Sequence, residues 1–462
     1  MSNDLSKLFN PSSIAIVGAS RTPGKIGHEI LKNLINGGYR GKIYPVNPKA
    51  NEILGFKCYP SISSIDNSID LAVICIPATL VPSVVEECGR KGVKFIIIIS
   101  SGFSETGNLE LEDKVVKIAR RYGVRIVGPN CAGIICSRSN LYATFEPIVK
   151  RGNVAFISQS GALGGAILYQ LIDEDKGLDI FVSIGNRADL METEIMEYLG
   201  KDPEVKAILV YIEGLKEGEG RAFMKAAMKI VPKKPVIVLK AGTSKAGMRA
   251  VQSHTGSIAG SDLIYTYAFK QAGVIKVDSV TDALDALYTL STQPIPSNGK
   301  VAIITNSGGP AVIAADHCEK LGLHVTPSSD NLKNKLSKIL PPFASLGNPI
   351  DMTAQAGAEE YKRVLELVIE SREYDIAIVI CVPPFFIDAL DIAKAICEVY
   401  SKYSFPIIPC FMAGSAVKKA VEYMSKRSLI NIPSPERASK SAFFLYKYGR
   451  LRVDARQAPD WE

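Results

Sequence analysis

The chain has 462 residues and a formal net charge of +7, and 47% of its residues are hydrophobic. A length of this order is typical of about three domains, and the apolar content is sufficient for their cores. The positive charge is modest and spread along the sequence, and its basic runs lack the interleaved aromatic residues of a single-strand nucleic-acid binder. We therefore expect no nucleic-acid partner, although a slightly basic protein still favours small anionic ligands.

The cysteines and the N-terminus indicate the compartment. The nine cysteines show no Cys-x-x-Cys spacing, and Cys75 and Cys381 lie inside apolar runs, as reduced cysteines do. The first residues lack the apolar stretch of a signal peptide, and no segment is long enough to span a membrane. We expect a cytoplasmic protein with reduced thiols, no membrane contact and no metal site on this chain.

Short runs rich in valine and isoleucine alternate with longer helical patterns, which is typical of parallel β-α-β units. Strands this apolar need helices on both faces of their sheet. A first series of predicted strands lies at 14–20, 42–48, 70–77, 94–102 and 124–130. A second lies within 152–166 and at 178–186, 205–214 and 234–242, and a third within 300–316 and at 375–384 and 405–414.

The three series predict three consecutive α/β domains with doubly wound parallel sheets. A Pro/Gly/Ser-rich stretch at 291–300 is typical of a linker and separates the second series from the third. The second and third series open alike, with an apolar strand, a Ser/Asn/Gly turn and a helix of small residues. We therefore expect a Rossmann-like domain over residues 1–128, then two flavodoxin-like domains over 129–292 and 299–462.

The turn after the first predicted strand has the composition of a phosphate-binding loop. Gly18, Ala19 and Ser20 allow backbone N–H groups to approach an anion where a helix begins. The second strand ends in basic Lys49 rather than in the acidic residue of a dinucleotide-binding fingerprint, and Arg21 and Lys25 add positive charge nearby. The pattern favours a phosphorylated ligand, although an ordinary tight turn with solvated lysines remains an alternative.

Two further turns join a strand to a helix of small residues. Each offers backbone N–H donors, hydroxyl groups and a helix N-terminus, which together can hold an anion, although serine is also a common helix cap. Two such turns in separate domains would form one phosphate site if both held a single phosphoryl group from opposite sides. The residues concerned are Ser158, Gln159, Ser160, Gly161 and Ala162 in the first turn and Asn306, Ser307, Gly308 and Gly309 in the second.

His254 lies in a stretch of small and hydroxyl residues that predicts an exposed loop. A neutral imidazole is a nucleophile near pH 7 and can accept a phosphoryl group reversibly. Glu213 ends a predicted strand, where α/β folds place functional residues, and a carboxylate can orient an imidazole. Taken alone, however, a single histidine is more often structural.

The motifs SQSGAL, YIEG, SHTGSIAG, NSGGPAV and GNPIDMT occur in this order along the chain. Together they resemble the α subunit of ADP-forming (NDP-forming) acyl-CoA synthetases, such as the acetyl-CoA synthetase of archaea, a group related to succinyl-CoA synthetase. The resemblance covers the whole chain. It implies that acyl-CoA and phosphate give an acyl phosphate, that the phosphoryl group passes to His254, and that it then converts ADP to ATP.

The resemblance also assigns roles to residues of this chain. Glu213 would stabilise the phosphohistidine, and the two turns with their helices would hold phosphate. Coenzyme A would contact residues at the ends of the first four strands. These are Gly18, Ala19, Ser20, Arg21, Lys25, Asn47, Pro48, Lys49, Ile76, Pro77, Ser100 and Ser101.

The chain lacks a segment that resembles an ATP-grasp module. The resemblance therefore implies a separate ATP-grasp β subunit that binds Mg²⁺ and ADP or ATP, in an α2β2 heterotetramer, while CoA and phosphate bind this chain. Two other functions stay open on the residues. A nicotinamide-dependent dehydrogenase would fit a Rossmann-like domain but lacks its glycine and acidic fingerprint, and a CoA-binding regulatory or scaffold subunit would not need both His254 and Glu213.

Overall fold

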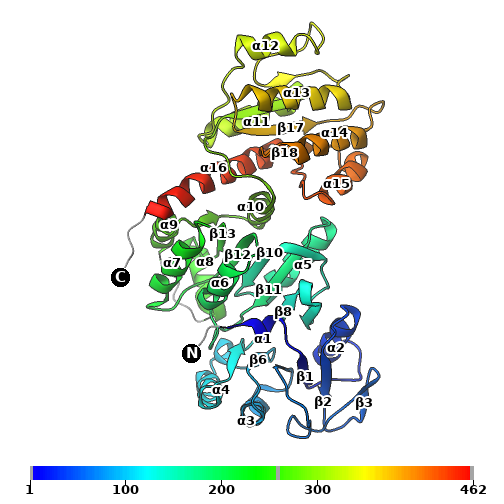
Figure 1. Ribbon diagram of the computed structural model, residues 1–462. Helices are drawn as coiled ribbons and strands as arrows, with labels where there is room; N and C mark the ends of the chain where they lie inside the picture. Colours follow the sequence, from blue (N-terminus) through cyan, green and yellow to red (C-terminus); the bar gives the residue numbers. More distant parts are fainter. Residues whose placement is uncertain (1–3, 256–260, 458–462) are drawn as a thin grey trace. The chain divides into compact units, whose positions relative to one another are not determined.

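The computed structural model describes residues 4–255 and 261–457, with side chains for residues 4–251 and 261–453. The chain divides into two compact units, Met1–Lys276 and Val277–Glu462. The first unit contains two large sheets and the second contains one (Figure 1).

The first sheet has five parallel strands in the order β2-β1-β5-β6-β7. Every residue of its central strands is buried, which requires helices on both faces. The strands are β1 (Ser13–Val17), β2 (Lys42–Val46), β5 (Leu71–Ile74), β6 (Phe95–Ile98) and β7 (Arg125–Val127), with a hairpin of β3 (Glu52–Ile53) and β4 (Phe56–Lys57) beside them. The helices are α1 (Ser6–Phe9), α2 (Ile26–Asn36), α3 (Val81–Lys91) and α4 (Leu109–Tyr122).

Helices α3 and α4 pack together and share one apolar core with the strands of this sheet. Helix α2 lies against β9 of the second sheet, where Asn33 Nδ2 donates to the carbonyl oxygens of Thr144 and Glu146, both at 2.8 Å. Arg125 adds ion pairs to Asp189 (2.9 Å) and Glu194 (2.8 Å). The first two sheets therefore form one compact unit.

The second sheet has seven strands in the order β14-β13-β12-β10-β11-β8-β9. The antiparallel pair β8–β9 extends its β11 edge. The strands are β8 (Gly133–Cys136), β9 (Leu141–Thr144), β10 (Arg151–Ser158), β11 (Leu178–Ser183), β12 (Ala207–Ile212), β13 (Val236–Lys240) and β14 (Ile275–Val277). The helices are α5 (Gly161–Asp173), α6 (Glu192–Lys201), α7 (Glu219–Ile230), α8 (Lys245–Thr255) and α9 (Asp262–Gln271).

The sheet of the second unit has four parallel strands in the order β16-β15-β17-β18. Helices α13 and α14 cover one face, and α11 and α16 pack together on the other, with α10 along α16. The strands are β15 (Val301–Thr305), β16 (Ile350–Asp351), β17 (Ile376–Cys381) and β18 (Ile407–Phe411). The helices are α10 (Val280–Thr292), α11 (Gly308–Lys320), α12 (Asp330–Leu336), α13 (Ala358–Ser371), α14 (Ala389–Lys402), α15 (Lys418–Ser425) and α16 (Pro435–Gln457).

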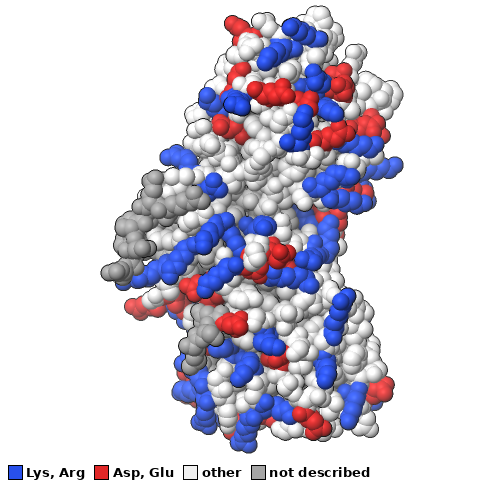
Figure 2. Space-filling model, in the orientation of Figure 1, with Lys and Arg blue, Asp and Glu red and all other residues white. Residues whose placement is uncertain are grey.

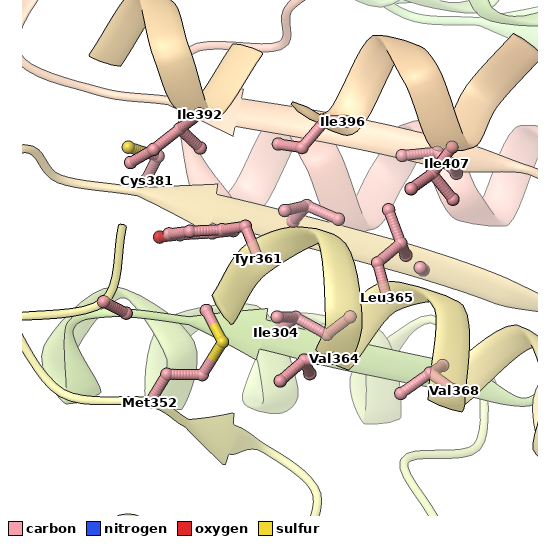
Figure 3. Close-up of a cluster of buried hydrophobic side chains, with 14 of the residues drawn as sticks. Ile304, Met352, Tyr361, Val364, Leu365, Val368, Cys381, Ile392, Ile396 and Ile407 are labelled. Atoms are coloured by element: carbon pink, nitrogen blue, oxygen red, sulfur yellow. The ribbon is translucent and has the colours of Figure 1, made fainter. Parts of the chain in front are cut away.

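The core of the second unit lies between its sheet and helices α13 and α14. Figure 3 shows Val364 and Leu365 of α13 and Ile396 of α14 directed toward the strands. Tyr361 is fully buried in the same core, and its hydroxyl group donates to the carbonyl oxygen of Ile380 at 2.7 Å. The one polar atom of this large ring therefore has a partner, as a buried hydroxyl requires.

Each of the three sheets places the first of its parallel strands between the second and the third. Thus β1 lies between β2 and β5, β10 between β11 and β12, and β15 between β16 and β17. In this doubly wound order the helices on either side of the first strand leave the sheet in opposite directions, and ligands bind beyond the carboxyl ends of the strands at that point. The predicted fold class is confirmed.

Every predicted strand is present, but some elements are not visible in the sequence pattern. These are the antiparallel β8–β9 pair, the short edge strands β14 and β16, and the β3–β4 hairpin. The backbone of residues 252–255 belongs to the last turn of α8, where a loop was expected. The predicted domain boundaries at 128/129 and 292–299 stay predictions; in the structure α10 packs along α16, and Arg437 of α16 pairs with Asp285 at 2.8 Å.

Candidate active site

The turn after β1 is built on a glycine that no other residue can replace without strain. Gly18 has a φ of +89°, and its N–H donates to the carbonyl oxygen of Val46 at 3.0 Å. A Cβ atom at this position would lie 2.4 Å from the carbonyl oxygen of Cys75. The chain therefore passes the end of β5 at a distance that only glycine allows.

Polar contacts fix the rest of this turn. Asn47 Nδ2 donates to the carbonyl oxygen of Ala19 at 2.8 Å, and its Oδ1 accepts from the N–H of Lys49 at 2.9 Å. His28 is buried, and its Nδ1 lies 2.9 Å from the carbonyl oxygen of Ser20, which can only accept. The partner of His28 lies across the turn, eight residues away along the chain.

The turn borders a pocket of about 380 Å³ at the carboxyl edge of the first sheet. Arg21, Pro48 and Lys49 are exposed. At the ends of β5 and β6, Ser100 Oγ donates to the carbonyl oxygen of Ile76 at 2.5 Å, and Pro77 and Ser101 are exposed. The predicted CoA residues thus follow the ends of four strands at one sheet edge. Those that line the pocket are Gly18, Ala19, Ser20, Lys25 and Asn47, together with Ile26, Gly27 and Cys75.

At the end of β10, the second sheet begins a helix in a similar way. Ser160 caps α5, since its Oγ accepts from the N–H of Leu163 at 3.3 Å, and Ser158 Oγ donates to the carbonyl oxygen of Ser160 at 2.6 Å. Gly161 and Ala162 form the first turn of α5, and the backbone N–H groups of a first turn have no partner within the helix. This end of α5 can therefore hold an anion.

Gln159 joins this turn to Glu213. Its Oε1 accepts from the N–H of Glu213 at 2.7 Å and of Gly214 at 3.2 Å, and its Nε2 donates to the carbonyl oxygen of Gly214 at 3.0 Å. Glu213 is 6% exposed, and the Tyr211 hydroxyl group donates to its Oε1 at 3.4 Å. Burial, and then the charge of Glu213, raise the pKa of Tyr211. The structure therefore joins the backbone of Glu213 to the turn that precedes α5.

A buried arginine that was not apparent from the sequence supports the same segment. Arg187 pairs with Glu192 at 2.8 Å and with Glu219 at 2.7 Å, and its Nη1 lies 3.4 Å from the carbonyl oxygen of Gly214. Its φ of +58° is rare for a residue with a side chain. The only sequence signal was a charged residue directly after an apolar strand.

The helix that carries His254 begins at the same edge of the second sheet. Helix α8 follows β13 and lies beside the short helical turn Ser104–Thr106, which follows β6 of the first sheet. His254 belongs to its last turn, but its side chain, like residues 256–260, lies outside the described residues. The proximity of His254 to Glu213 stays a prediction.

The second unit repeats the β10–α5 turn with different side chains. Thr305 Oγ1 donates to the carbonyl oxygen of Ser307 at 2.8 Å, in the place of Ser158. Asn306 bridges to the end of β17, exchanging two hydrogen bonds of 3.0 Å with the backbone of Val382. Gly308 and Gly309 begin α11. The second unit therefore keeps these hydrogen bonds of the turn. Val382, the first residue after β17, occupies the position that Glu213 has after β12 in the first unit.

The surface carries no single basic band on the face shown in Figure 2, where lysine and arginine are interspersed with aspartate and glutamate. Among residues 4–255 and 261–457, no helix is long and apolar enough to cross a membrane. All nine cysteines are free.

Comparisons with known proteins agree with this geometry. Family models match a CoA binding domain at residues 12–137, a succinyl-CoA ligase like flavodoxin domain at 151–290 and a ligase-CoA domain at 301–452. The chain is 44% identical to the α subunit of acetate–CoA ligase (ADP-forming) II from Pyrococcus furiosus, over 96% of this chain and 98% of that one.

Two further relatives extend the comparison. An ADP-forming acetate–CoA ligase from Methanocaldococcus jannaschii is 43% identical over 97% of this chain, which spans 64% of that protein. The acetyl-coenzyme A synthetase 1 of Candidatus Korarchaeum cryptofilum, solved with phosphate and ADP, is 41% identical, with a TM-score of 0.94 over 99% of both chains. The chain therefore belongs to the family of α subunits of ADP-forming acetate–CoA ligases.

Proposed function

We propose that this chain, with a separate ATP-grasp β subunit, catalyses the reversible reaction acyl-CoA + ADP + phosphate ⇌ carboxylic acid + CoA + ATP. The observation that carries the proposal is the position of Glu213. It lies at the end of β12, bound through Gln159 to the N-terminal turn of α5, at the sheet edge where α8 leads to His254.

The proposed reaction has three steps. A phosphate oxygen attacks the acyl-CoA carbonyl carbon, and CoA leaves as its thiol, which gives an acyl phosphate. A ring nitrogen of His254 then attacks the phosphorus, the bond to the acyl oxygen breaks, and the carboxylate leaves. Finally, an oxygen of ADP attacks the phosphorus, the nitrogen–phosphorus bond breaks, and ATP forms.

The residues of this chain bind and position the reacting groups. Backbone N–H groups and Lys25 in the pocket beside Gly18 would bind the phosphates of CoA, and the exposed Arg21 would add positive charge nearby. The first turn of α5 supplies donors for the transferred phosphoryl group, since phosphoryl transfer depends mainly on positioning and on donors aimed at the equatorial oxygens. Glu213 would orient the imidazole and stabilise its positive charge after phosphorylation.

The nucleotide step belongs to the partner in this proposal. The β subunit would bind Mg²⁺ and ADP or ATP, and two copies of each subunit would form an α2β2 heterotetramer. The subunit naming of the Pyrococcus relative and the longer Methanocaldococcus relative support a second component. Acetate is the proposed acid, although one relative at 36% identity is a 4-hydroxybutyrate–CoA ligase.

Phosphohistidine formation tests the proposal directly. The chain is incubated with its β subunit, Mg²⁺ and γ-labelled ATP, and the label is tested for acid lability and base stability. We expect the wild type to become labelled, His254→Asn to lose the label, and Glu213→Gln to give less label while CoA binding stays normal. Label that persists in His254→Asn would exclude the relay, and loss of both label and CoA binding in Glu213→Gln would mean a structural role for the glutamate.

A ligand panel separates the alternative functions. CoA binding without any response to NADH excludes a dehydrogenase, and phosphate-dependent ATP formation from acyl-CoA and ADP excludes a purely regulatory subunit. The same assay, run over several acyl-CoA thioesters, identifies the preferred acid.

A further inference from the structure

Lys240 is a buried lysine to which the relay above assigns no part. It ends β13 at the carboxyl edge of the second sheet and is 4% exposed. Its Nζ donates to the carbonyl oxygen of Glu213 at 2.9 Å and to that of Ala241, and it lies 4.7 Å from the centre of the Tyr265 ring. Since a buried ammonium group is costly unless its donors are used, each of these contacts matters.

The segment 213–215 is held by side chains from three other elements. The N–H groups of Glu213 and Gly214 donate to Gln159 Oε1, at 2.7 and 3.2 Å. The carbonyl oxygen of Glu213 accepts from Lys240. The N–H of the segment's last residue donates to the Tyr265 hydroxyl oxygen at 3.0 Å. Tyr265 belongs to α9, the helix that follows the His254 segment, so Lys240 lies between the Glu213 segment and that helix.

The charges around Lys240 come from each neighbouring element. Burial lowers the pKa of Lys240 to about 8, whereas Asp262 of α9 and Glu213 favour its charged form and Lys276 of β14 opposes it. Asp262 in turn pairs with Lys276 at 2.7 Å. The ammonium group is therefore close to titration at mildly alkaline pH.

A second buried lysine, which lies just before β13, distinguishes a role at Glu213 from a general structural role. Lys234, just before β13 and at the opposite edge of the sheet, donates to the carbonyl oxygens of Leu199 (2.7 Å) and Asp202, and burial lowers its pKa to about 8 as well. The two lysines share burial, carbonyl partners and titration range. The two lysines differ in their partners, because only Lys240 contacts the Glu213 segment and α9.

We propose that Lys240 is a positioning residue for the phosphohistidine step. Its ammonium group fixes the backbone of Glu213 against α9 and places a positive charge beside the Glu213 carboxylate. Because the carboxylate favours the charged form of Lys240, the ammonium group in turn favours the ionised form of the carboxylate, and its bond to the Glu213 carbonyl oxygen holds this residue in place for the proposed step. This inference rests on the proposed function, and it adds that the step weakens as Lys240 loses its proton.

The test measures labelling by γ-labelled ATP in the complex with the β subunit, from about pH 6 to about pH 9, which spans the titration of Lys240. Lys240→Met is compared with Lys234→Met as its matched control, and melting temperature and CoA binding are measured for both. We expect Lys240→Met to label on the order of tenfold more slowly or less, as when other orienting residues are removed, with normal CoA binding. Lys234→Met should label at the wild-type rate.

Lys240→Arg gives an independent result if the methionine variant does not fold. Arginine keeps the charge and does not titrate in this range, so the fall in labelling rate that we expect near pH 8 in the wild type should be absent from Lys240→Arg. Three results would overturn the role of Lys240 while leaving the proposed function intact. They are a wild-type labelling rate in Lys240→Met, a fall in labelling rate near pH 8 that persists in Lys240→Arg, and equal losses of labelling in Lys240→Met and Lys234→Met. A wild type that forms no phosphohistidine would overturn the proposed function and this inference with it.

Discussion

At the scale of single residues, backbone geometry decides where ligands can approach. Gly18 combines a positive φ with a close passage by the end of β5, whereas Gly55 has a φ of +82° and no atom near the place of a Cβ. The two glycines thus separate the cost of the left-handed conformation from the cost of crowding. Only the crowded one lines the pocket beside β1.

We expect Gly18→Ala to destabilise the protein and to weaken CoA binding by at least about tenfold, because the methyl group would displace the backbone at Cys75. Gly55→Ala should cost only about 1 kcal/mol, the price of the backbone conformation, and should leave CoA affinity unchanged. Calorimetric titration with CoA and thermal unfolding measure both effects. Equal CoA affinity in the two variants would show that the turn does not contact the ligand.

At the scale of elements, two serine caps of the same type allow a comparison between a proposed site and a structural position. Ser160 begins α5 at the proposed phosphoryl site, with a cap bond of 3.3 Å to Leu163 N. Ser279 begins α10, and its Oγ accepts from the N–H of Asp282 at 3.0 Å. A hydroxyl cap stabilises a helix by about 1 kcal/mol wherever it occurs, so stability alone cannot distinguish them.

The rate of phosphohistidine formation should distinguish the two serine caps. Ser160→Ala and Ser279→Ala should each lower the free energy of unfolding by about 1 kcal/mol. Only Ser160→Ala should also reduce the rate of phosphohistidine formation, because it loosens the first turn of α5 where the phosphoryl group binds. Chemical unfolding and the labelling assay measure the two quantities, and a normal labelling rate in Ser160→Ala would remove α5 from the proposed site.

At the scale of the whole molecule, three sheets with a common order of parallel strands place the turns that carry the proposed site residues at their carboxyl edges. The opposite edge of the second sheet carries Asp179, which is 1% exposed, with Arg138 Nε at 3.4 Å. Burial raises the pKa of Asp179 to about 6, although Arg138 opposes the shift. Asp202, which forms a second ion pair with Arg138, has a pKa below its usual value because hydrogen bonds from Arg138 and Glu204 outweigh its burial.

The two carboxylates predict opposite pH dependences. Between about pH 4 and pH 6 the folded protein keeps a proton on Asp179 that the unfolded chain has released, so the free energy of unfolding falls as pH rises through this range. Asp179→Asn should therefore raise the melting temperature at about pH 8 by a few degrees and change little at about pH 4. Asp202→Asn should lower it at about pH 8, since the folded state favours ionised Asp202. Thermal scans across pH measure both, and a lower melting temperature for Asp179→Asn at about pH 8 would contradict the assignment.

The amino-acid sequence alone determined the fold class, most of the strands and the residue types at each carboxyl edge, because strand apolarity and turn composition are local properties. It also placed Ser158–Ala162 and Glu213 on separate motifs of one family. Only the tertiary structure decided that Gln159 binds the Glu213 segment, that Lys240 and Arg187 support it, and that Val382 replaces the glutamate in the second unit. These contacts join residues far apart along the chain, such as Gln159 and Glu213 at a separation of 54, and depend on which strands become neighbours. Strand order is a property of the packed sheet, and no single segment encodes it.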